Sequence, residues 1–186
     1  MPKIADIEKT PNPNAMRFVL KEPLTQGVAR SFENAEQAAG DPLAAALFAV
    51  PHVTNVFYVD RWLTVTQDGE AYWDKLLLLL APPIRAAAAA TPVSAGEAEE
   101  ATPRKTRVAP EDEERLAQIN AVLDERVRPA LLSDGGGLEI LEFADNKLVI
   151  RYQGACGTCP SSLSGTLMAI ESVIRSVDPD VEVIAV

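Results

Sequence analysis

Histidine, cysteine and basic residues are all scarce in this sequence of 186 residues. It contains one histidine and two cysteines, and its 17 Lys and Arg stand against 27 Asp and Glu, which gives a net charge of -10. Two cysteines are too few for the disulfide framework of a small secreted domain. Binding of nucleic-acid phosphates requires a basic surface, so the charge argues against nucleic acid as a partner.

Long hydrophobic runs are also missing. The longest leucine run covers residues 76–80, far fewer than the roughly 20 residues that cross a bilayer. Residues 1–6 show neither an apolar signal core nor an Arg-rich amphipathic presequence. We therefore expect a soluble protein with no membrane partner in a reducing compartment, the bacterial cytoplasm. A mitochondrial protein stripped of its presequence is the alternative.

Residues 1–83 have the pattern of a small mixed α/β domain. Asp41 and Pro42 predict a helix start, because a capping side chain is followed by a proline in the first turn. Pro82 and Pro83 are expected to end the last helix, because proline lacks the amide hydrogen that a helix interior needs. Local patterns predict strands at 15–20, 53–59 and 62–66 and helices at 42–50 and 70–80.

Residues 84–111 differ in composition from both neighbours. An alanine run is followed by Thr, Pro, Ser and Gly, then by acidic residues 97–100 and a basic patch at 104–107, with no aromatic residue. No apolar periodicity persists, so we predict a flexible linker.

Residues 112–186 predict a second small domain with the order α-β-β-α-β. Apolar residues at spacings of three and four indicate a first helix over 116–130, which Pro129 should kink or break. The remaining elements are a turn at 133–137, strands at 138–143, 148–152 and 181–186, and a helix at 160–177. The expected fold class is therefore α/β in the α+β sense, with two small mixed domains joined by a flexible linker.

Both cysteines lie in one short loop, Cys156-Gly157-Thr158-Cys159, between a predicted strand and a predicted helix. This spacing brings two thiolates to a single metal centre, and soft thiolates select iron–sulfur clusters, zinc or copper(I). Pro160 favours the first turn of the helix, whose positive end would favour the thiolate of Cys159. Cys156 and Cys159 are therefore the candidate ligands.

Other uses of this loop are weaker. A closed zinc site needs four ligands, and the sequence has no second C-x-x-C pair; His52 lies in the other domain, where we expect a surface or packing role. A thioredoxin-like redox pair shares the same local context. However, only 27 residues follow Cys159, and they supply one helix and one strand, which is less than that fold requires.

Glycines surround the cysteine loop. Gly135, Gly136 and Gly137 either let the backbone approach the loop closely or permit the positive φ of a tight turn, and the sequence leaves both explanations open. Gly154 and Gly157 would leave the backbone around the sulfurs uncrowded, with N–H groups available to the sulfur atoms.

Two sets of residues resemble known domains. Residues 127–137 and 154–162, with Ile170-Glu171, resemble the NifU C-terminal domain. Residues 11–18 and 42–44, with Leu47-Phe48, resemble the Nfu N-terminal domain. Their order is that of Nfu-type proteins. Two departures are Gly137, where the family often has an acidic residue, and Gly165, where it often has threonine.

The resemblance implies an iron–sulfur cluster scaffold or carrier. We do not expect an enzyme, because no catalytic base is paired with the thiols and no phosphate-binding glycine loop opens a helix after a strand. The resemblance also implies a 4Fe–4S cluster, with 2Fe–2S as the alternative, held by Cys156 and Cys159 of two subunits in a cluster-bound homodimer. The expected partners are apo iron–sulfur client proteins and an upstream cluster-assembly scaffold. The expected domains are an Nfu N-terminal-like domain for client recognition (1–83), the linker (84–111) and a NifU C-terminal-like cluster-binding domain (112–186).

Overall fold

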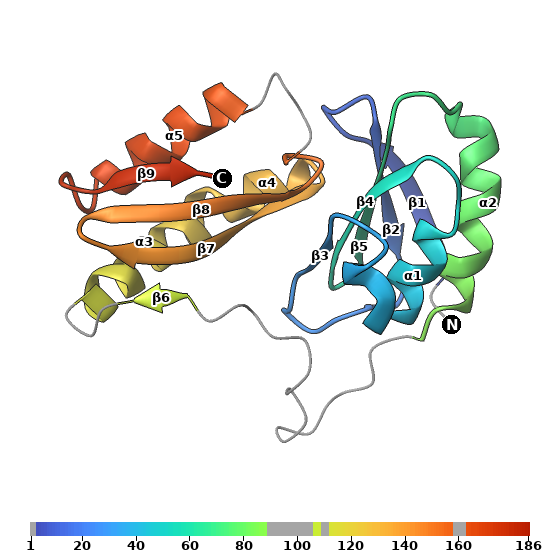
Figure 1. Cartoon of the computed structure of the whole chain (residues 1–186), viewed down its shortest axis with the longest axis horizontal. Coiled ribbons are helices and arrows are strands. Elements are labelled where there is room, and N and C mark those ends of the chain that lie inside the picture. The colour runs from blue at the N-terminus through green and yellow to red at the C-terminus, as the bar shows by residue number, and fades with distance from the viewer. Residues whose placement is uncertain (1–2, 89–105, 109–111, 158–162) are drawn as a thin grey trace. The chain divides into compact units, whose positions relative to one another are not determined.

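The computed structural model describes residues 3–88, 106–108, 112–157 and 163–186. The chain divides into two compact units, residues 1–100 and 101–186, which we call the N-terminal and C-terminal units. Each unit combines helices with one sheet (Figure 1). The predicted fold class, two small mixed domains, is confirmed.

The sheet of the N-terminal unit is antiparallel throughout, with the strand order β1-β2-β5-β4-β3. Three strands match the prediction, while β1 and β3 were not predicted. The strands are β1 (Ile4–Lys9), β2 (Ala15–Leu20), β3 (Arg30–Phe32), β4 (Val53–Val59) and β5 (Trp62–Gln67). One face of this sheet shares a hydrophobic core with helices α1 (Pro42–Phe48) and α2 (Trp73–Ala86).

Helix α1 begins as predicted. The Oδ1 atom of Asp41 accepts a hydrogen bond of 2.9 Å from the backbone N–H of Ala44, and Pro42 occupies the first turn. This cap satisfies one of the amide groups that a helix start leaves without an intrahelical partner. A short 3-10 helix, η1 (Gln37–Gly40), leads into it.

The predicted end of α2 is wrong. The helix starts at Trp73 and continues through Pro82 and Pro83 to Ala86. Ile84 is fully buried in the core, so its burial favours another helical turn. The prolines remove the hydrogen bonds to the carbonyls of residues 78 and 79, and both of those residues, Leu78 and Leu79, are exposed.

Only part of the predicted linker lies among the described residues. Residues 84–86 belong to α2, and Arg107–Val108 form the short strand β6, which pairs parallel with β7 (Gly136–Ala144). The stretch predicted as a linker thus contributes a short strand at 107–108, whose backbone completes an edge of the C-terminal sheet. Residues 89–105 and 109–111 lie outside the described part of the chain.

The sheet of the C-terminal unit has the order β6-β7-β8-β9. The central pair, β7 and β8 (Lys147–Gly154), contains the strands predicted at 138–143 and 148–152 and forms an antiparallel hairpin, and β9 (Glu182–Ala185) runs parallel to β8. Asp145 and Asn146 make the two-residue turn with φ values of 51° and 61°, as a type I′ hairpin turn requires.

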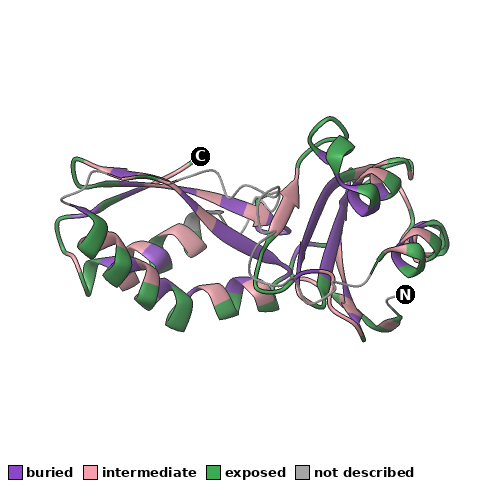
Figure 2. Cartoon of the chain, turned by 90° about the horizontal axis from the view of Figure 1, so that it is seen from below, coloured by how far each residue is buried: buried purple, intermediate pink, exposed green. Residues whose placement is uncertain are grey.

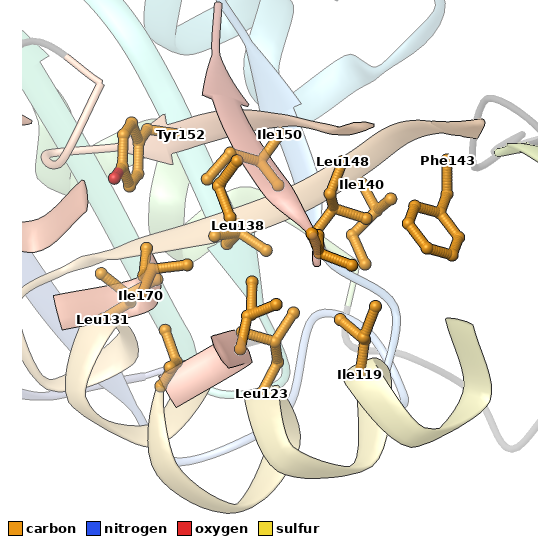
Figure 3. Packing of buried hydrophobic residues seen from close by; sticks show 14 of the residues in the cluster. Ile119, Leu123, Leu131, Leu138, Ile140, Phe143, Leu148, Ile150, Tyr152 and Ile170 are labelled. Carbon is orange, nitrogen blue, oxygen red and sulfur yellow. The ribbon is translucent and has the colours of Figure 1, made fainter. Parts of the chain in front are cut away.

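Three helices pack against one face of this sheet, as Figures 2 and 3 show. They are α3 (Glu113–Arg126), α4 (Arg128–Ser133) and α5 (Leu163–Arg175). The predicted break near Pro129 is confirmed, because the helix stops at Arg126 and restarts with proline in the first turn of α4. None of the helices among the described residues is long and apolar enough to cross a membrane.

Arg115 links the start of α3 to the end of the C-terminal sheet where β7 turns into β8. Its guanidinium donates hydrogen bonds of 2.8 Å to Asp178, 2.9 Å to Asp112 and 3.0 Å to the side-chain oxygen of Asn146. It also lies 5.3 Å from the centre of the Phe143 ring, within the range of a cation–π contact.

Candidate metal centre

Cys156 lies in a turn that starts where β8 ends. Gly154 adopts a φ of 64°, which reverses the chain direction. The N–H of Ala155 then donates to the carbonyl of Gly135 at 3.2 Å, and the N–H of Gly157 donates to the carbonyl of Gly154 at 3.2 Å. Cys156 is 6% exposed and belongs to the hydrophobic core of the C-terminal unit. The cysteine is therefore held by the sheet and not by an open surface loop.

The two glycines at the start of β7 have different structural roles. Gly135 has a φ of 81°, a conformation that disfavours other residues. Gly136 pairs with Gly154 in the β7–β8 ladder. A Cβ atom on Gly136 would stand 2.6 Å from the Sγ of Cys156 and 2.6 Å from the carbonyl oxygen of Gln153. Of the two explanations that the sequence left open, the turn applies to Gly135 and the close approach to Gly136.

Gly157 packs tightly as well, but Gly165 does not. A Cβ on Gly157 would lie 3.1 Å from the carbonyl oxygen of Tyr152, so this turn folds back over the last residues of β8. At Gly165 an added Cβ would meet nothing within 4 Å. The departure from the family pattern at Gly165 is therefore not required by packing.

Tyr152, on the strand that leads to Cys156, was not among the candidate residues predicted from the sequence. It belongs to the buried row of β8 with Leu148 and Ile150, and it is 6% exposed. Its buried hydroxyl has no hydrogen-bond partner among the described residues. Burial, then the charges of Cys156 and Glu171, raise the pKa of Tyr152 to about 12. The available signal was a single hydroxyl in an otherwise apolar alternating row, four residues before the first cysteine.

The second candidate ligand, Cys159, lies outside the described residues, as does Pro160. The pairing of Cys156 with Cys159 and the start of the following helix at Pro160 therefore stay predictions. Helix α5 is described from Leu163.

His52, in the N-terminal unit, has the surface position that we expected. Its Nδ1 lies 2.9 Å from the Oδ2 of Asp68, and both side chains are exposed. Potential ligand atoms of His52, Asp68 and Glu70 lie within 4.8 Å of one another. The N–H of Glu70 and the His52 side chain lower the pKa of Asp68. These contacts account for the grouping as a hydrogen bond and a turn between residues just before β4 and just after β5.

Comparison with known proteins assigns both units. The family model described as "Scaffold protein Nfu/NifU N terminal" matches residues 4–89, and the model of the NifU-like domain matches residues 119–185. The human mitochondrial NFU1 iron-sulfur cluster scaffold homolog is 32% identical over 181 residues, covering 94% of this chain and 68% of that protein. The chain therefore belongs to the Nfu/NifU family of scaffold proteins, and the predicted resemblance is confirmed.

A second relative agrees with this assignment, and a match to a solved structure carries no further argument. The mitochondrial NifU-like protein 4 of Arabidopsis thaliana is 32% identical over 174 residues, covering 90% of this chain and 60% of that protein. The chain thus spans about three fifths to two thirds of the length of these relatives. Among solved structures, protein SAV1430 from Staphylococcus aureus matches 44% of this chain and 96% of its own, with 24% identity and a TM-score of 0.38.

Proposed function

We propose that this protein is a carrier of iron–sulfur clusters, which are its cargo, and that Cys156 and Cys159 bind them. The observation that carries the proposal is the packing around Cys156, in a chain of the Nfu/NifU family. Gly136 brings the β7 backbone against the cysteine sulfur, and the β7–β8 ladder fixes that approach. A soft sulfur ligand on a rigid strand end suits an iron–sulfur cluster.

The number of ligands implies a dimer. A 4Fe–4S cluster takes about four thiolates, and each chain contains only two cysteines. Two chains that meet on a two-fold axis would supply four, one C-x-x-C pair from each. The net charge of -10 on each chain opposes this contact, so we expect a dimer that depends on the bound cluster. The same four thiolates could instead hold a 2Fe–2S cluster.

The two units divide the work in this proposal. The C-terminal unit, with boundaries near residues 112–186, carries the cluster, and the N-terminal unit, near residues 1–83, recognises apo-protein clients. An upstream assembly scaffold supplies the cluster. The protein releases its cargo unchanged and is not an enzyme. We place it in the bacterial cytoplasm, although the relatives described above have mitochondrial names.

Anaerobic reconstitution with iron and sulfide tests the binding step. We expect visible charge-transfer absorption, a dimer by gel filtration and about four irons per two chains. Cys156→Ala and Cys159→Ala should each abolish both the absorption and the dimer, with Gly165→Ala as the matched control that keeps both. A monomer that holds a full cluster would refute the bridging arrangement. Efficient reduction of insulin disulfides by the apo-protein, without cluster uptake, would favour the thioredoxin-like alternative.

A transfer experiment tests the carrier role. Loaded protein is mixed with an apo-dehydratase, and activation is compared with that produced by equal amounts of free iron and sulfide. Faster activation by the loaded protein supports a carrier, whereas equal rates would leave only storage. Cutting the chain near residue 100 should leave a C-terminal fragment that still loads and an N-terminal fragment that does not.

A further inference from the structure

The hydroxyl of Tyr152 lacks the partner that a buried polar group normally has. The side chain is 6% exposed, its hydroxyl has no hydrogen-bond partner among the described residues, and its neighbours in the buried row of β8 are Leu148 and Ile150. A phenylalanine would fill nearly the same space and would leave no hydrogen-bond donor without a partner. Buried hydroxyls are nearly always paired, and one that is not calls for a specific explanation.

The surroundings of Tyr152 point toward the cysteine. Tyr152 and Cys156 belong to the same core cluster, and the turn after Cys156 folds back over the Tyr152 carbonyl, within 3.1 Å of where a Cβ on Gly157 would stand. In Figure 3, Tyr152 lies at the opposite end of the labelled core residues from Phe143. The hydroxyl is therefore at the cysteine end of the unit.

Glu171 is the other charged group that acts on Tyr152. Its carboxylate is engaged by Arg175, one helical turn further along α5, at 3.5 Å. Its side chain is also partly exposed, so water can complete its hydrogen bonds. Of the two charged groups that raise the pKa of Tyr152, the sulfur of Cys156 is the one that becomes more anionic when the protein takes up its cargo.

We propose that Tyr152 is a positioning residue for the cluster: its O–H donates a hydrogen bond to the metal-bound sulfur of Cys156 or to a sulfide of the cluster that this cysteine holds. The inference rests on the proposed function. Hydrogen bonds to cluster sulfurs are one of the means by which proteins set reduction potential. The bond would stabilise the reduced, more negative cluster, and it would give the stranded hydroxyl a partner only in the loaded state.

Tyr152→Phe separates this role from simple packing, because it removes the hydroxyl and keeps the ring. In the loaded protein we expect a lower midpoint potential. The equilibrium constant for one-electron reduction should fall by about threefold to tenfold, and tenfold corresponds to about 59 mV. In the apo-protein the variant should be at least as stable as wild type, so loading should stabilise wild type more than the variant. Tyr152→Leu should shift the potential in the same direction.

Tyr58→Phe is the matched control. Tyr58 is also a buried strand tyrosine, but it lies in the N-terminal unit and its hydroxyl donates to Asp41. Its removal should leave the potential of the cluster unchanged. If wild type takes up no cluster, the proposed function itself fails. If wild type loads and both Tyr152 variants keep its potential and its rate of cluster loss to a chelator, the inference fails while the carrier function stands.

Discussion

The two buried tyrosines, one in each unit, differ in the partners of their hydroxyl groups. Tyr58 of the N-terminal unit donates to the carboxylate of Asp41, which also accepts from the Arg30 guanidinium at 2.7 Å and from the N–H of Ala44 at 2.9 Å. Tyr152 of the C-terminal unit has no such partner among the described residues. In the first unit the hydroxyl helps to hold a helix cap; in the second it is left available beside a cysteine.

The contrast extends to backbone packing. In the N-terminal unit, hydrogen bonds to the Asp41 carboxylate join β3, β4 and the start of α1, so these polar groups stabilise the fold. In the C-terminal unit the backbone of Gly136 lies against the sulfur of Cys156, so that a Cβ added there would stand 2.6 Å from it. A contact that is too close, or an unpaired polar group in a core, lowers the stability of the fold. Its presence therefore calls for a reason other than stability. Among the described residues, buried side-chain atoms without a partner also occur in the N-terminal unit, at Arg30, Asn55 and Thr66. The contrast therefore concerns the two tyrosines and not the two units as wholes.

The largest effect should come from Gly136→Ala. The new Cβ would stand 2.6 Å from both the Cys156 sulfur and the Gln153 carbonyl oxygen, and the backbone atom cannot move without disturbing the β7–β8 ladder. Overpacking of this kind costs about 3 kcal/mol, measured as the free energy of unfolding of the C-terminal unit in urea. Iron uptake should fall to background. A variant that loads iron like wild type would show that the close approach is not needed for the site.

Tyr58→Phe should have the next largest effect, and in the other unit. It removes one donor from the buried Asp41 carboxylate, and hydrogen bonds to charged groups contribute about 2 kcal/mol. Unfolding of the N-terminal unit should become easier by that amount while cluster uptake stays normal. Tyr72→Phe, at a tyrosine that is 78% exposed, is the control and should change neither. Unchanged stability in Tyr58→Phe would remove the contrast between the two tyrosines.

Much of the fold follows from local signals in the sequence. The cap at Asp41, the hairpin turn at residues 145–146 and the break before Pro129 were predictable because each depends on a few neighbouring residues. β1 and β3 were missed because they are the edge strands of their sheet, with little buried alternation to mark them. The course of α2 through two prolines depends on the burial of Ile84, which is a tertiary effect.

The site was predictable in chemistry but not in geometry. Scarcity and spacing alone marked Cys156 and Cys159 as candidate ligands. The sequence could not assign separate tasks to Gly135 and Gly136, because the difference lies in a contact with a residue about twenty positions away. Tyr152 escaped notice because a tyrosine in a strand is usually unremarkable, and only the three-dimensional structure reveals that its hydroxyl is stranded.

Gly165→Ala should have a smaller effect of opposite sign. Gly165 lies in α5, and an added Cβ would meet nothing within 4 Å. Alanine should therefore stabilise the C-terminal unit, by up to about 1 kcal/mol, because glycine is a poor helix former. Chemical unfolding of the apo-protein measures this gain, and iron uptake should be unchanged. Destabilisation would mean that the glycine serves the cysteine loop in some way that its open surroundings do not reveal.

The smallest effect concerns a charge far from the cysteine. The Arg115 guanidinium lowers the pKa of the Asp178 carboxyl below its usual value of 3.8. The carboxylate is thus more stable in the folded than in the unfolded protein. Its contribution is fully present above that usual value and is lost as the pH falls through the lowered folded-state pKa. Because the pair lies near the surface, we expect only about 0.5 kcal/mol.

Asp178→Asn tests this contribution. Near neutral pH the variant should unfold at slightly lower urea concentration than wild type, and the difference should shrink as the solution is acidified below about pH 4. Asp180→Asn, which removes an equal charge at an exposed position two residues away, is the control for net charge. A difference that persists unchanged into acid would mean that Asp178 acts through packing or its backbone hydrogen bond and not through its charge. Such a result would leave Arg115 held chiefly by Asp112 and the Phe143 ring.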